Sequence, residues 1–370
     1  MRIVVTGGNG FIGSNLRVRL AESGFTDVVS VGSGADAREL AAAVESSDFA
    51  FHLAGANRPS DVADFARVNV GVTAAVCDAL LSTGRAIPIV YTSSTQAVLD
   101  NPYGNSKRDA EAVLERYAEQ SGAAVTVMRL TNVFGKWARP NYNSAVATFC
   151  HNIARGASIK IHDPAASLRL VYVDDVVDAM LAQLASPTSG FRMTDVRPVY
   201  ETTVGEVAAT IESFAASRQT LTIPRVGAGL VRALYATYVS YLTPDNFTYD
   251  LTRHADPRGV FVEMLRTFDS GQFSYFTAGP GITRGEHYHH TKTEKFLVVR
   301  GTARFGFRHL LSGEIREIIT EGERPRVVET VPGWVHNITN VGDGEMIVLL
   351  WANERFDPAK PDTIPAKVSS

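Results

Sequence analysis

The chain has 370 residues, enough for about two or three domains with sizeable cores. Apolar residues make up 45% and charged residues 20%, which excludes disordered and fibrous proteins. Lys+Arg number 36 and Asp+Glu 39, so the net charge is −3 and gives no electrostatic reason to expect a nucleic-acid or membrane partner. Only Cys77 and Cys150 occur, which fits a reducing compartment. Without a secretory signal or 18 consecutive apolar residues, we expect a cytoplasmic protein.

Short apolar runs alternate with helical patterns up to about residue 240, which predicts a doubly wound parallel sheet. Buried strands are expected at Ile3–Val5, Val28–Val31, Ala50–Leu53, Ile87–Tyr91 and Val125–Arg129. Helices are expected at Phe11–Ala21, Ala37–Val44, Val62–Leu81, Gly104–Glu119, Asp174–Leu184, Val204–Phe214 and Gly229–Leu242.

Beyond about Pro244 the expected elements are short strands rich in β-branched and aromatic residues and separated by glycines. They lie at Phe261–Leu265, Gln272–Phe276, Lys295–Val299, Ala303–Arg308, Ile315–Thr320 and Glu345–Trp351. This pattern predicts an antiparallel sandwich or barrel. We therefore expect two domains, residues 1–243 and 244–370.

A glycine-rich turn directly follows the first expected strand and opens a helix. Gly7, Gly10 and Gly13 have the spacing GxxGxxG, with Phe11 and Ile12 inside it. Glycines allow a tight turn and close approach of a pyrophosphate, and the helix start offers free N–H groups. In this context the pattern predicts a dinucleotide site.

The end of the second expected strand bears on the choice of dinucleotide. NAD usually needs a carboxylate there, but the strand ends in Ser33, and no acid occurs before Asp36. A small polar turn with Arg38 nearby leaves room for the 2′-phosphate of NADP(H), which we expect to be preferred. The alternative is that Asp36 binds the ribose of NAD.

Three polar residues in the N-terminal half predict proton-transfer chemistry. Tyr103 and Lys107 lie four apart on an expected helix and so share one face. The lysine charge lowers the pKa of the tyrosine and favours proton exchange with a substrate oxygen. Ser94, at the end of a strand, can hold the same oxygen.

Together these motifs resemble the extended short-chain dehydrogenase/reductase family, which acts on nucleotide sugars. The resemblance covers roughly residues 1–240 and rests on Thr6–Gly13, His52–Gly55, Asn69, Ser94, Tyr103 with Lys107, Arg129–Gly135 and Val171–Asp175. It implies a Tyr-Lys-Ser active site, cofactor contacts from Leu53, Ala54, Gly55, Tyr103 and Lys107, and substrate contact at Asn132. Ser94 and Tyr103 are closer in sequence than is usual in the family, so Ser93 or Thr92 is an alternative serine-like group.

Six of the nine histidines lie between residues 254 and 336. His287 and His289 share one face of an expected strand, Glu294 can return on the next strand, and a later strand can bring His336. Three neutral imidazoles and one carboxylate suit a divalent metal such as Zn, Ni, Mn or Fe.

These motifs resemble the cupin family over about residues 245–352. The first cupin motif matches in full; in the second, Pro332 and Gly333 are adjacent where one residue normally separates them. The resemblance implies an all-β cupin barrel with one divalent metal, zinc being our choice, bound by His287, His289, Glu294 and His336. The alternative is a metal-free cupin whose histidines pack or bind substrate.

Two stretches also resemble the cupin-fold nucleotide-sugar 3,5-epimerases. They are Asp256–Glu263 and Arg284–Tyr288, and they imply that Arg258, Glu263 and Arg284 hold substrate. This resemblance implies that His287 is the general base. That role conflicts with metal ligation, because an imidazole bound to a metal cannot also accept a proton. We favour ligation, with His290 or a metal-bound hydroxide as base; an exposed salt bridge is the alternative interpretation of Arg258 and Glu263.

A reductase fused to an epimerase is chemically consistent, because a C4 ketone makes the C3 proton of a sugar acidic and reduction then fixes the stereochemistry. Nearly the whole chain resembles a family of bifunctional capsular-polysaccharide enzymes, in stretches such as Ala56–Pro59, Phe134–Trp137, Pro140–Ser144 and Phe356–Thr363. That resemblance implies homodimers that epimerise C3 of a UDP-2-acetamido-2,6-dideoxy-4-hexulose and reduce C4 with NADPH, giving UDP-2-acetamido-2,6-dideoxy-L-talose.

Three other functions stay open at this point. The chain could be a single-activity reductase or epimerase whose cupin domain only dimerises or binds ligand. It could be a nucleotide sensor without catalysis. It could also keep NAD bound and run an internal oxidation and reduction.

Overall fold

The computed structural model describes residues 1–32, 35–252, 254–256, 259–261, 265–267, 271–354 and 359–369. It packs as two compact units, Met1–Ser144 with Ser167–Thr202, and Ala145–Ala166 with Thr203–Ser370. The chain passes between the units after residues 144, 166 and 202, whereas the expected domain boundary follows residue 243. That boundary stays a prediction, because compactness does not show which segments fold independently.

The first unit is built on a parallel sheet in the order β2-β1-β3-β4-β5-β8, in which every neighbouring pair is parallel. Its strands are β1 (Ile3–Thr6), β2 (Val28–Val31), β3 (Phe49–His52), β4 (Ile89–Ser94), β5 (Ala124–Leu130) and β8 (Gly190–Thr194). A smaller sheet contains β6 (Asn132–Phe134), β7 (Ser167–Tyr172) and β9 (Tyr200–Thr203).

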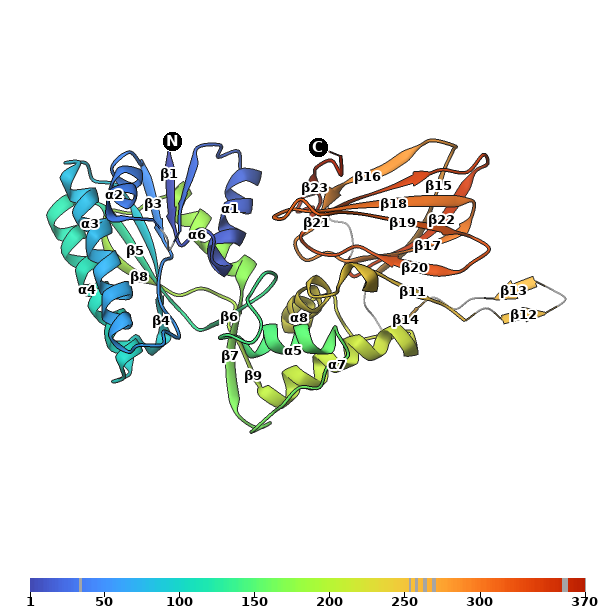
Figure 1. Ribbon diagram of the computed structural model, residues 1–370, viewed down its shortest axis with the longest axis horizontal. Helices are drawn as coiled ribbons and strands as arrows, with labels where there is room; N and C mark the ends of the chain where they lie inside the picture. The colour runs from blue at the N-terminus through green and yellow to red at the C-terminus, as the bar shows by residue number, and fades with distance from the viewer. Residues whose placement is uncertain are drawn as a thin grey trace. The chain divides into compact units, whose positions relative to one another are not determined.

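Helices cover both faces of the parallel sheet, as expected for a doubly wound fold (Figure 1). One face carries α2 (Ala37–Glu45), α3 (Val72–Ser82) and α4 (Pro102–Ser121), and the other carries α1 (Phe11–Glu22) and α6 (Val173–Ala185). Every residue of β1, β3 and β4 is buried, which explains their near-continuous apolar sequences. The carboxyl ends of these strands position the first candidate site.

The helix expected at Val62–Leu81 is present, but its first part, Phe65–Gly71, is a π-helix that runs directly into α3. Together they form Phe65–Ser82, which has the length and mean hydropathy, 1.3, of a membrane-crossing helix. Counting uninterrupted apolar residues missed this property, because an averaged window tolerates polar positions. Within its unit α3 packs between α2 and α4, as core helices do.

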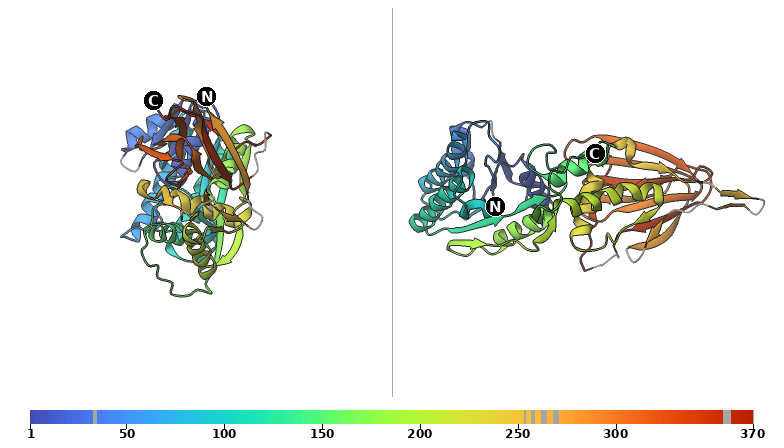
Figure 2. Two further views of the ribbon diagram at one scale, coloured as in Figure 1. Left: turned by 90° about the vertical axis from the view of Figure 1, so that its right-hand side faces the viewer. Right: turned by 90° about the horizontal axis from the view of Figure 1, so that it is seen from below.

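The second unit combines three helices with two antiparallel sheets. The helices α5 (Ala145–Ile153), α7 (Val204–Thr220) and α8 (Gly229–Ser240) pack on one another and lie beside the strands (Figure 2). One sheet has the order β11-β20-β17-β22-β15 and the other β19-β18-β21-β16-β23. This confirms the expected fold class, a Rossmann-like sheet followed by an all-β, cupin-like domain.

The strands of these two sheets follow in chain order. They are β11 (Thr248–Asp250), β15 (Gln272–Ala278), β16 (Thr283–Tyr288), β17 (Glu294–Arg300), β18 (Thr302–His309), β19 (Ile315–Glu321), β20 (Arg326–Glu329), β21 (Trp334–Asn340), β22 (Met346–Ala352) and β23 (Ile364–Pro365). A β-bulge lies in β16 between Gly285 and His287, where Glu286 has a φ of 60°. The bulge re-aims the strand just before the first expected metal ligand.

Candidate active site and metal centre

The turn after β1 has the shape that the glycine spacing predicts. Gly7 has a φ of 68°, and a Cβ there would lie 2.8 Å from the backbone nitrogen of Ala54. A Cβ on Gly13 would lie 2.3 Å from the carbonyl oxygen of Gly7. Helix α1 begins at Phe11, and no side chain caps it. The cradle therefore leaves helix N–H groups for a pyrophosphate.

Asp36 is already used by its own helix. Its carboxylate accepts hydrogen bonds from the backbone nitrogens of Arg38 and Glu39, both at 2.8 Å, and so caps α2. Binding a ribose instead would cost this cap, about 1 kcal/mol. The side chain of Arg38 is exposed, and Ser33 lies outside the described residues. This arrangement favours the expected contact of Arg38 with a 2′-phosphate over the alternative in which Asp36 binds the ribose of NAD.

The structure brings Ser94, Tyr103 and Lys107 together. Ser94 ends β4 and is hydrogen-bonded to Tyr103, which lies in the first turn of α4. Lys107, one turn later, donates to the hydroxyl of Tyr91 at 3.2 Å and to the carbonyl oxygen of Thr92 at 3.0 Å.

The alternative serine-like groups are engaged elsewhere. The hydroxyl of Ser93 donates to the buried carboxylate of Glu111, which also pairs with Arg129 at 2.6 Å. Of Thr92, it is the backbone carbonyl that meets Lys107. Ser94 is therefore the strand-end hydroxyl that faces Tyr103.

Burial sets the electrostatics of this site. It lowers the pKa of Lys107 to about 8, although the negative charge of Glu111 opposes the shift. It also raises the pKa of Tyr103, although the hydrogen bond from Ser94 opposes the shift. The expectation that the charge of Lys107 lowers the pKa of this tyrosine is therefore wrong for the site as the structure shows it, where burial dominates. Tyr103 is thus protonated at neutral pH and suits a general acid. A Cβ on Gly55 would lie 3.2 Å from Nζ of Lys107, so the loop after β3 closes on the same point.

Asn132, the expected substrate contact, lies at the start of β6. Its side chain is exposed and donates to the carbonyl oxygen of Arg169 at 3.2 Å. Its neighbour Thr131 bonds to the same oxygen. A small cavity of about 50 Å³ opens nearby, lined by Thr95 and Arg129 among others. Asn132 does not line that cavity, so its role in binding stays a prediction.

The second site gathers the four expected metal ligands. One ligand atom from each of His287, His289, Glu294 and His336 lies within 4.8 Å of the others. Oε2 of Glu294 is 3.2 Å from Nε2 of His289 and 3.4 Å from Nε2 of His336. The three imidazole rings have centroid separations of 4.7 to 5.2 Å.

A segment near the C-terminal end of the same chain orients His289. Its Nδ1 donates to the carbonyl oxygen of Asp362, which leaves Nε2 as the lone-pair nitrogen toward the cluster. The carboxylate of Asp362 in turn accepts backbone N–H bonds from Thr291 and Lys292, both at 2.7 Å. Metal-binding histidines commonly have such outer partners.

Burial and mutual repulsion keep the cluster ready for a cation. Burial lowers the pKa of His287 to about 4, and the nearby His336 and His289 add to that shift. Burial alone would raise the pKa of Glu294, but His289 and His336 hold it well below its usual range. Three imidazoles and a carboxylate match the donor set of zinc. The four residues therefore fit a divalent metal.

The expected substrate contacts of this half are only partly described. Arg258 and Glu263 lie outside the described residues. Arg284 is exposed on β16, with its guanidinium 5.0 Å from the ring centre of Phe276. His290, the alternative base, is buried, with its ring 5.7 Å from that of Tyr288.

Two family models match the chain. The NAD dependent epimerase/dehydratase family matches residues 3–196, and the polysaccharide biosynthesis C-terminal domain matches residues 254–364. The chain belongs to the NAD dependent epimerase/dehydratase family. The first match spans the glycine-rich turn, Ser94, Tyr103 and Lys107; the second spans the histidine cluster.

Relatives cover the whole length. The chain is 54% identical over 368 residues to UDP-2-acetamido-2,6-beta-L-arabino-hexul-4-ose reductase of Pseudomonas aeruginosa, covering 100% of this chain and 99% of that protein. It resembles the crystal structure of the capsular polysaccharide assembling protein CapF from Staphylococcus aureus, with 41% identity and a TM-score of 0.68 over 99% of this chain and 100% of that one. This confirms the resemblance to capsular-polysaccharide enzymes.

A third similar structure covers only part of the chain. It is RMD from Pseudomonas aeruginosa complexed with NADPH, with 25% identity and a TM-score of 0.50 over 58% of this chain and 82% of that one.

Sequence reasoning missed several residues that shape the sites. Asp362 lies in a Pro-rich stretch after the last expected strand, and its acceptor role depends on contacts with residues about 70 positions earlier in the chain. Tyr91 and Glu111 were read as strand and helix residues, although both surround Lys107. The i, i+4 spacing of Lys107 and Glu111 was the available signal.

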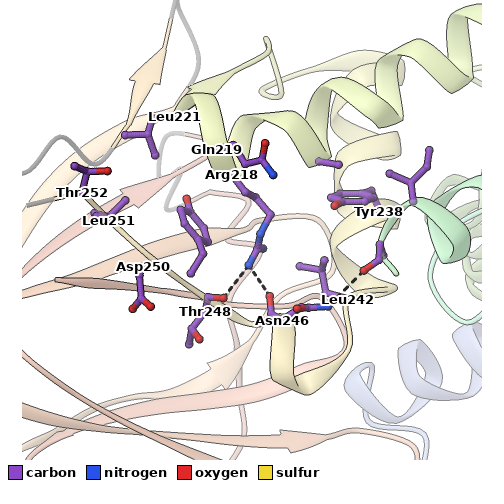
Figure 3. A pocket seen from close by; sticks show the side chains of 14 residues that line it. Arg218, Gln219, Leu221, Tyr238, Leu242, Asn246, Thr248, Asp250, Leu251 and Thr252 are labelled. Carbon is purple, nitrogen blue, oxygen red and sulfur yellow. Dashed lines mark hydrogen bonds between the residues drawn. The ribbon is translucent and has the colours of Figure 1, made fainter. Parts of the chain in front are cut away.

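A cavity of about 470 Å³ lies at neither site (Figure 3). It is lined by residues of α7, α8 and β11, and none of the described site residues is among them. Arg218 at its wall donates to the carbonyl oxygens of Asn246, at 2.6 Å, and Thr248, at 3.2 Å, and pairs with the buried Glu329. The guanidinium of Arg218 is therefore already bound by groups of the protein, and we assign no ligand to this cavity.

Proposed function

We propose that the chain is a bifunctional nucleotide-sugar enzyme. The cupin-like part epimerises C3 of a UDP-2-acetamido-2,6-dideoxy-4-hexulose, and the Rossmann-like part reduces the C4 ketone with NADPH. The product is UDP-2-acetamido-2,6-dideoxy-L-talose, used for UDP-N-acetyl-L-fucosamine in capsule or O-antigen synthesis. The observation that carries this proposal is the presence of two complete chemical centres in one chain: Ser94, Tyr103 and Lys107, and the four-residue histidine and carboxylate cluster.

The reduction needs a proton donor beside a hydride source. NADPH, when bound, supplies the hydride to C4. Tyr103 donates the proton to the C4 oxygen, and Ser94 holds that oxygen by a hydrogen bond. The positive charge of Lys107 lowers the cost of leaving a phenolate on Tyr103. The cradle of Gly7 and Gly13 and the exposed Arg38 support NADPH as the cofactor.

The epimerisation needs a stabilised enolate. A base, for which we propose His290, takes the proton from C3, which the C4 ketone acidifies, and a proton is then returned to C3 on the opposite face. A divalent metal held by His287, His289, Glu294 and His336, for which we propose zinc, would supply a Lewis acid when bound. His289 is pre-oriented for that role by Asp362. Arg284, Arg258 and Glu263 are proposed to hold the sugar nucleotide.

Chemistry fixes the order of the two steps. Once the ketone is reduced, the C3 proton is no longer acidic and the centre cannot be inverted. Epimerisation therefore precedes reduction. We further propose that the enzyme acts as a cytoplasmic homodimer on a UDP-sugar, on the strength of the family resemblance; light scattering would test the dimer.

Isotope exchange separates the two activities. The metal-loaded protein is incubated with the 4-keto sugar in D₂O without NADPH, and deuterium at C3 is followed by NMR. We expect wash-in at C3, and we expect NADPH consumption to disappear in Tyr103→Phe while wash-in continues. The Pseudomonas aeruginosa relative is named only as a reductase, which favours reductase activity alone as the second candidate. Reduction without any C3 exchange would establish that candidate.

A further inference from the structure

A chain of buried polar groups runs from Lys107 under the parallel sheet toward the glycine-rich turn. Nζ of Lys107 donates to the hydroxyl of Tyr91, which is hydrogen-bonded to Thr73. His52 lies between two hydroxyls, with Nε2 2.8 Å from Oγ1 of Thr73 and Nδ1 2.6 Å from Oγ1 of Thr6. None of these five residues is more than 4% exposed. We call them the buried polar chain.

Counting protons gives this chain a direction. The single hydroxyl proton of Thr73 goes to the carbonyl oxygen of Asn69, at 2.6 Å. Oγ1 of Thr73 can therefore only accept from His52, so Nε2 of His52 carries the proton and Nδ1 accepts from Thr6. Burial lowers the pKa of His52 to about 3, with the charge of Lys107 adding to the shift, so the ring is neutral. Tyr91 then also donates to Thr73.

The direction matters for Lys107. Because the hydroxyl proton of Tyr91 points to Thr73, its oxygen lone pairs face the ammonium group. The carbonyl oxygen of Thr92 takes a second N–H. Two of the three ammonium protons are thus fixed by residues of β4. Among the described residues, the titratable groups that interact with Lys107 include Tyr91 from β4, His52 from β3 and Glu111 from α4, and Tyr103 from α4 interacts with Tyr91.

We propose that Tyr91 is a positioning residue for the reduction: its hydroxyl, oriented by Thr73 and His52, fixes the ammonium of Lys107 and favours its charged form. The inference rests on the proposed reductase function, because it assigns a task to Lys107 in that reaction. Tyr91 contacts neither the cofactor nor the substrate ketone, and it acts only through Lys107.

Direct titration of Lys107 tests the proposal without any substrate. The full chain is labelled with [ε-¹⁵N]lysine, and the Lys107 signal is assigned by its loss in Lys107→Met. We expect Tyr91→Phe to lower the titration midpoint of Lys107 by about one pH unit, because an acceptor of the ammonium is lost. With the 4-keto substrate, we expect kcat to fall about fivefold at pH 8, because the charged fraction of Lys107 falls from about one half to about one tenth, while KM changes little.

Matched variants separate positioning from packing. Tyr117 is also a buried tyrosine, with its hydroxyl on the carbonyl oxygen of Ile87 at 2.7 Å, and Tyr117→Phe should leave the midpoint and kcat unchanged. Thr73→Val should shift the midpoint as Tyr91→Phe does, and Thr73→Ser should restore it. This second pair serves if Tyr91→Phe does not fold.

The proposal is overturned if Lys107 titrates alike in Tyr91→Phe, in Thr73→Val and in the parent. If Tyr91→Phe shifts the midpoint of Lys107 but the parent protein reduces no 4-keto sugar, the effect of Tyr91 on Lys107 is supported and the reductase function is rejected. The two failures are therefore distinguishable.

Discussion

At the scale of single residues, Asp36 and Arg38, which follow β2, have different roles. Asp36 caps α2, and the exposed guanidinium of Arg38 is the group that can meet a 2′-phosphate. We expect Arg38→Ala to weaken NADPH binding by about tenfold, the value of a lost charge-assisted hydrogen bond of about 1.5 kcal/mol. Binding of NADH should not change. Calorimetric titration with both dinucleotides checks this, and an equal loss for NADH would contradict it.

His52 makes a second prediction at this scale, on pH and stability. Its pKa is about 3 in the folded chain because of burial, against 6.5 for an exposed histidine. Below pH 6.5 the unfolded state binds a proton that the folded state cannot. The stability contributed by neutral His52 is therefore complete above pH 6.5 and is lost as the pH falls toward 3, by about 1.4 kcal/mol per pH unit.

His52→Gln should lack this component. Unfolding by urea at pH 7, 6 and 5 should show a smaller loss of stability in the variant than in the parent. The other histidines titrate in both proteins, so their contribution to the pH dependence of stability cancels when the variant is compared with the parent. Parallel losses in the two proteins would show that His52 gains a proton without unfolding.

At the scale of elements, the start of α4 is fixed by close backbone contacts. A Cβ on Gly104 would lie 2.3 Å from the carbonyl oxygen of Gln96 and 2.6 Å from that of Leu99. Gly104→Ala must therefore displace the turn that carries Tyr103, and we expect a loss of about 1–3 kcal/mol in stability together with most of the reductase activity.

The other end of the same helix offers the control. Gly122 has a φ of 69° and no atom near the position of a Cβ, so it needs conformational freedom but not space. Gly122→Asn should cost less than about 1 kcal/mol and spare the activity. Thermal unfolding and NADPH oxidation check both variants. Equal effects of the two would mean that contact at Gly104 is not what places Tyr103.

The same elements show what the sequence could predict. Strand Val28–Val31 and the start of α1 follow from local apolar and glycine patterns, and they were predicted correctly. The π-helical start of the helix was not predicted. Its buried Asn69 accepts a hydrogen bond from the backbone nitrogen of Ala56 at 2.8 Å and donates one to the hydroxyl of Ser106 at 2.9 Å. Such long-range contacts leave no local periodicity.

The candidate sites divide in the same way. Spacing and resemblance predicted the four residues of the histidine cluster, because i, i+2 spacing on a strand is a local property. The groups that orient them, such as Asp362, are brought in by pairing of distant segments. Tyr91 and Thr73 were hidden for another reason: polar residues inside apolar segments are read as core until their partners are known.

At the scale of the whole molecule, the proposed function connects the two candidate centres through one substrate, which moves from the first to the second. The C3 epimers of a 4-keto sugar interconvert freely until the ketone is reduced, so the intermediate can leave one centre and enter the other. We therefore expect complementation. Tyr103→Phe should epimerise without reducing, and His289→Ala should reduce only what is already epimerised.

Mixing these two variants should restore NADPH consumption on the unepimerised substrate, which neither variant supports alone. Product formation is followed by absorbance of NADPH and by NMR of the sugar. Addition of a chelator should silence the Tyr103→Phe partner and abolish the restored activity, because the cluster of His287, His289, Glu294 and His336 is intact only there. A mixture as inactive as its components would mean that the intermediate is never released, and that both centres must belong to one assembly for the sequence of steps to proceed.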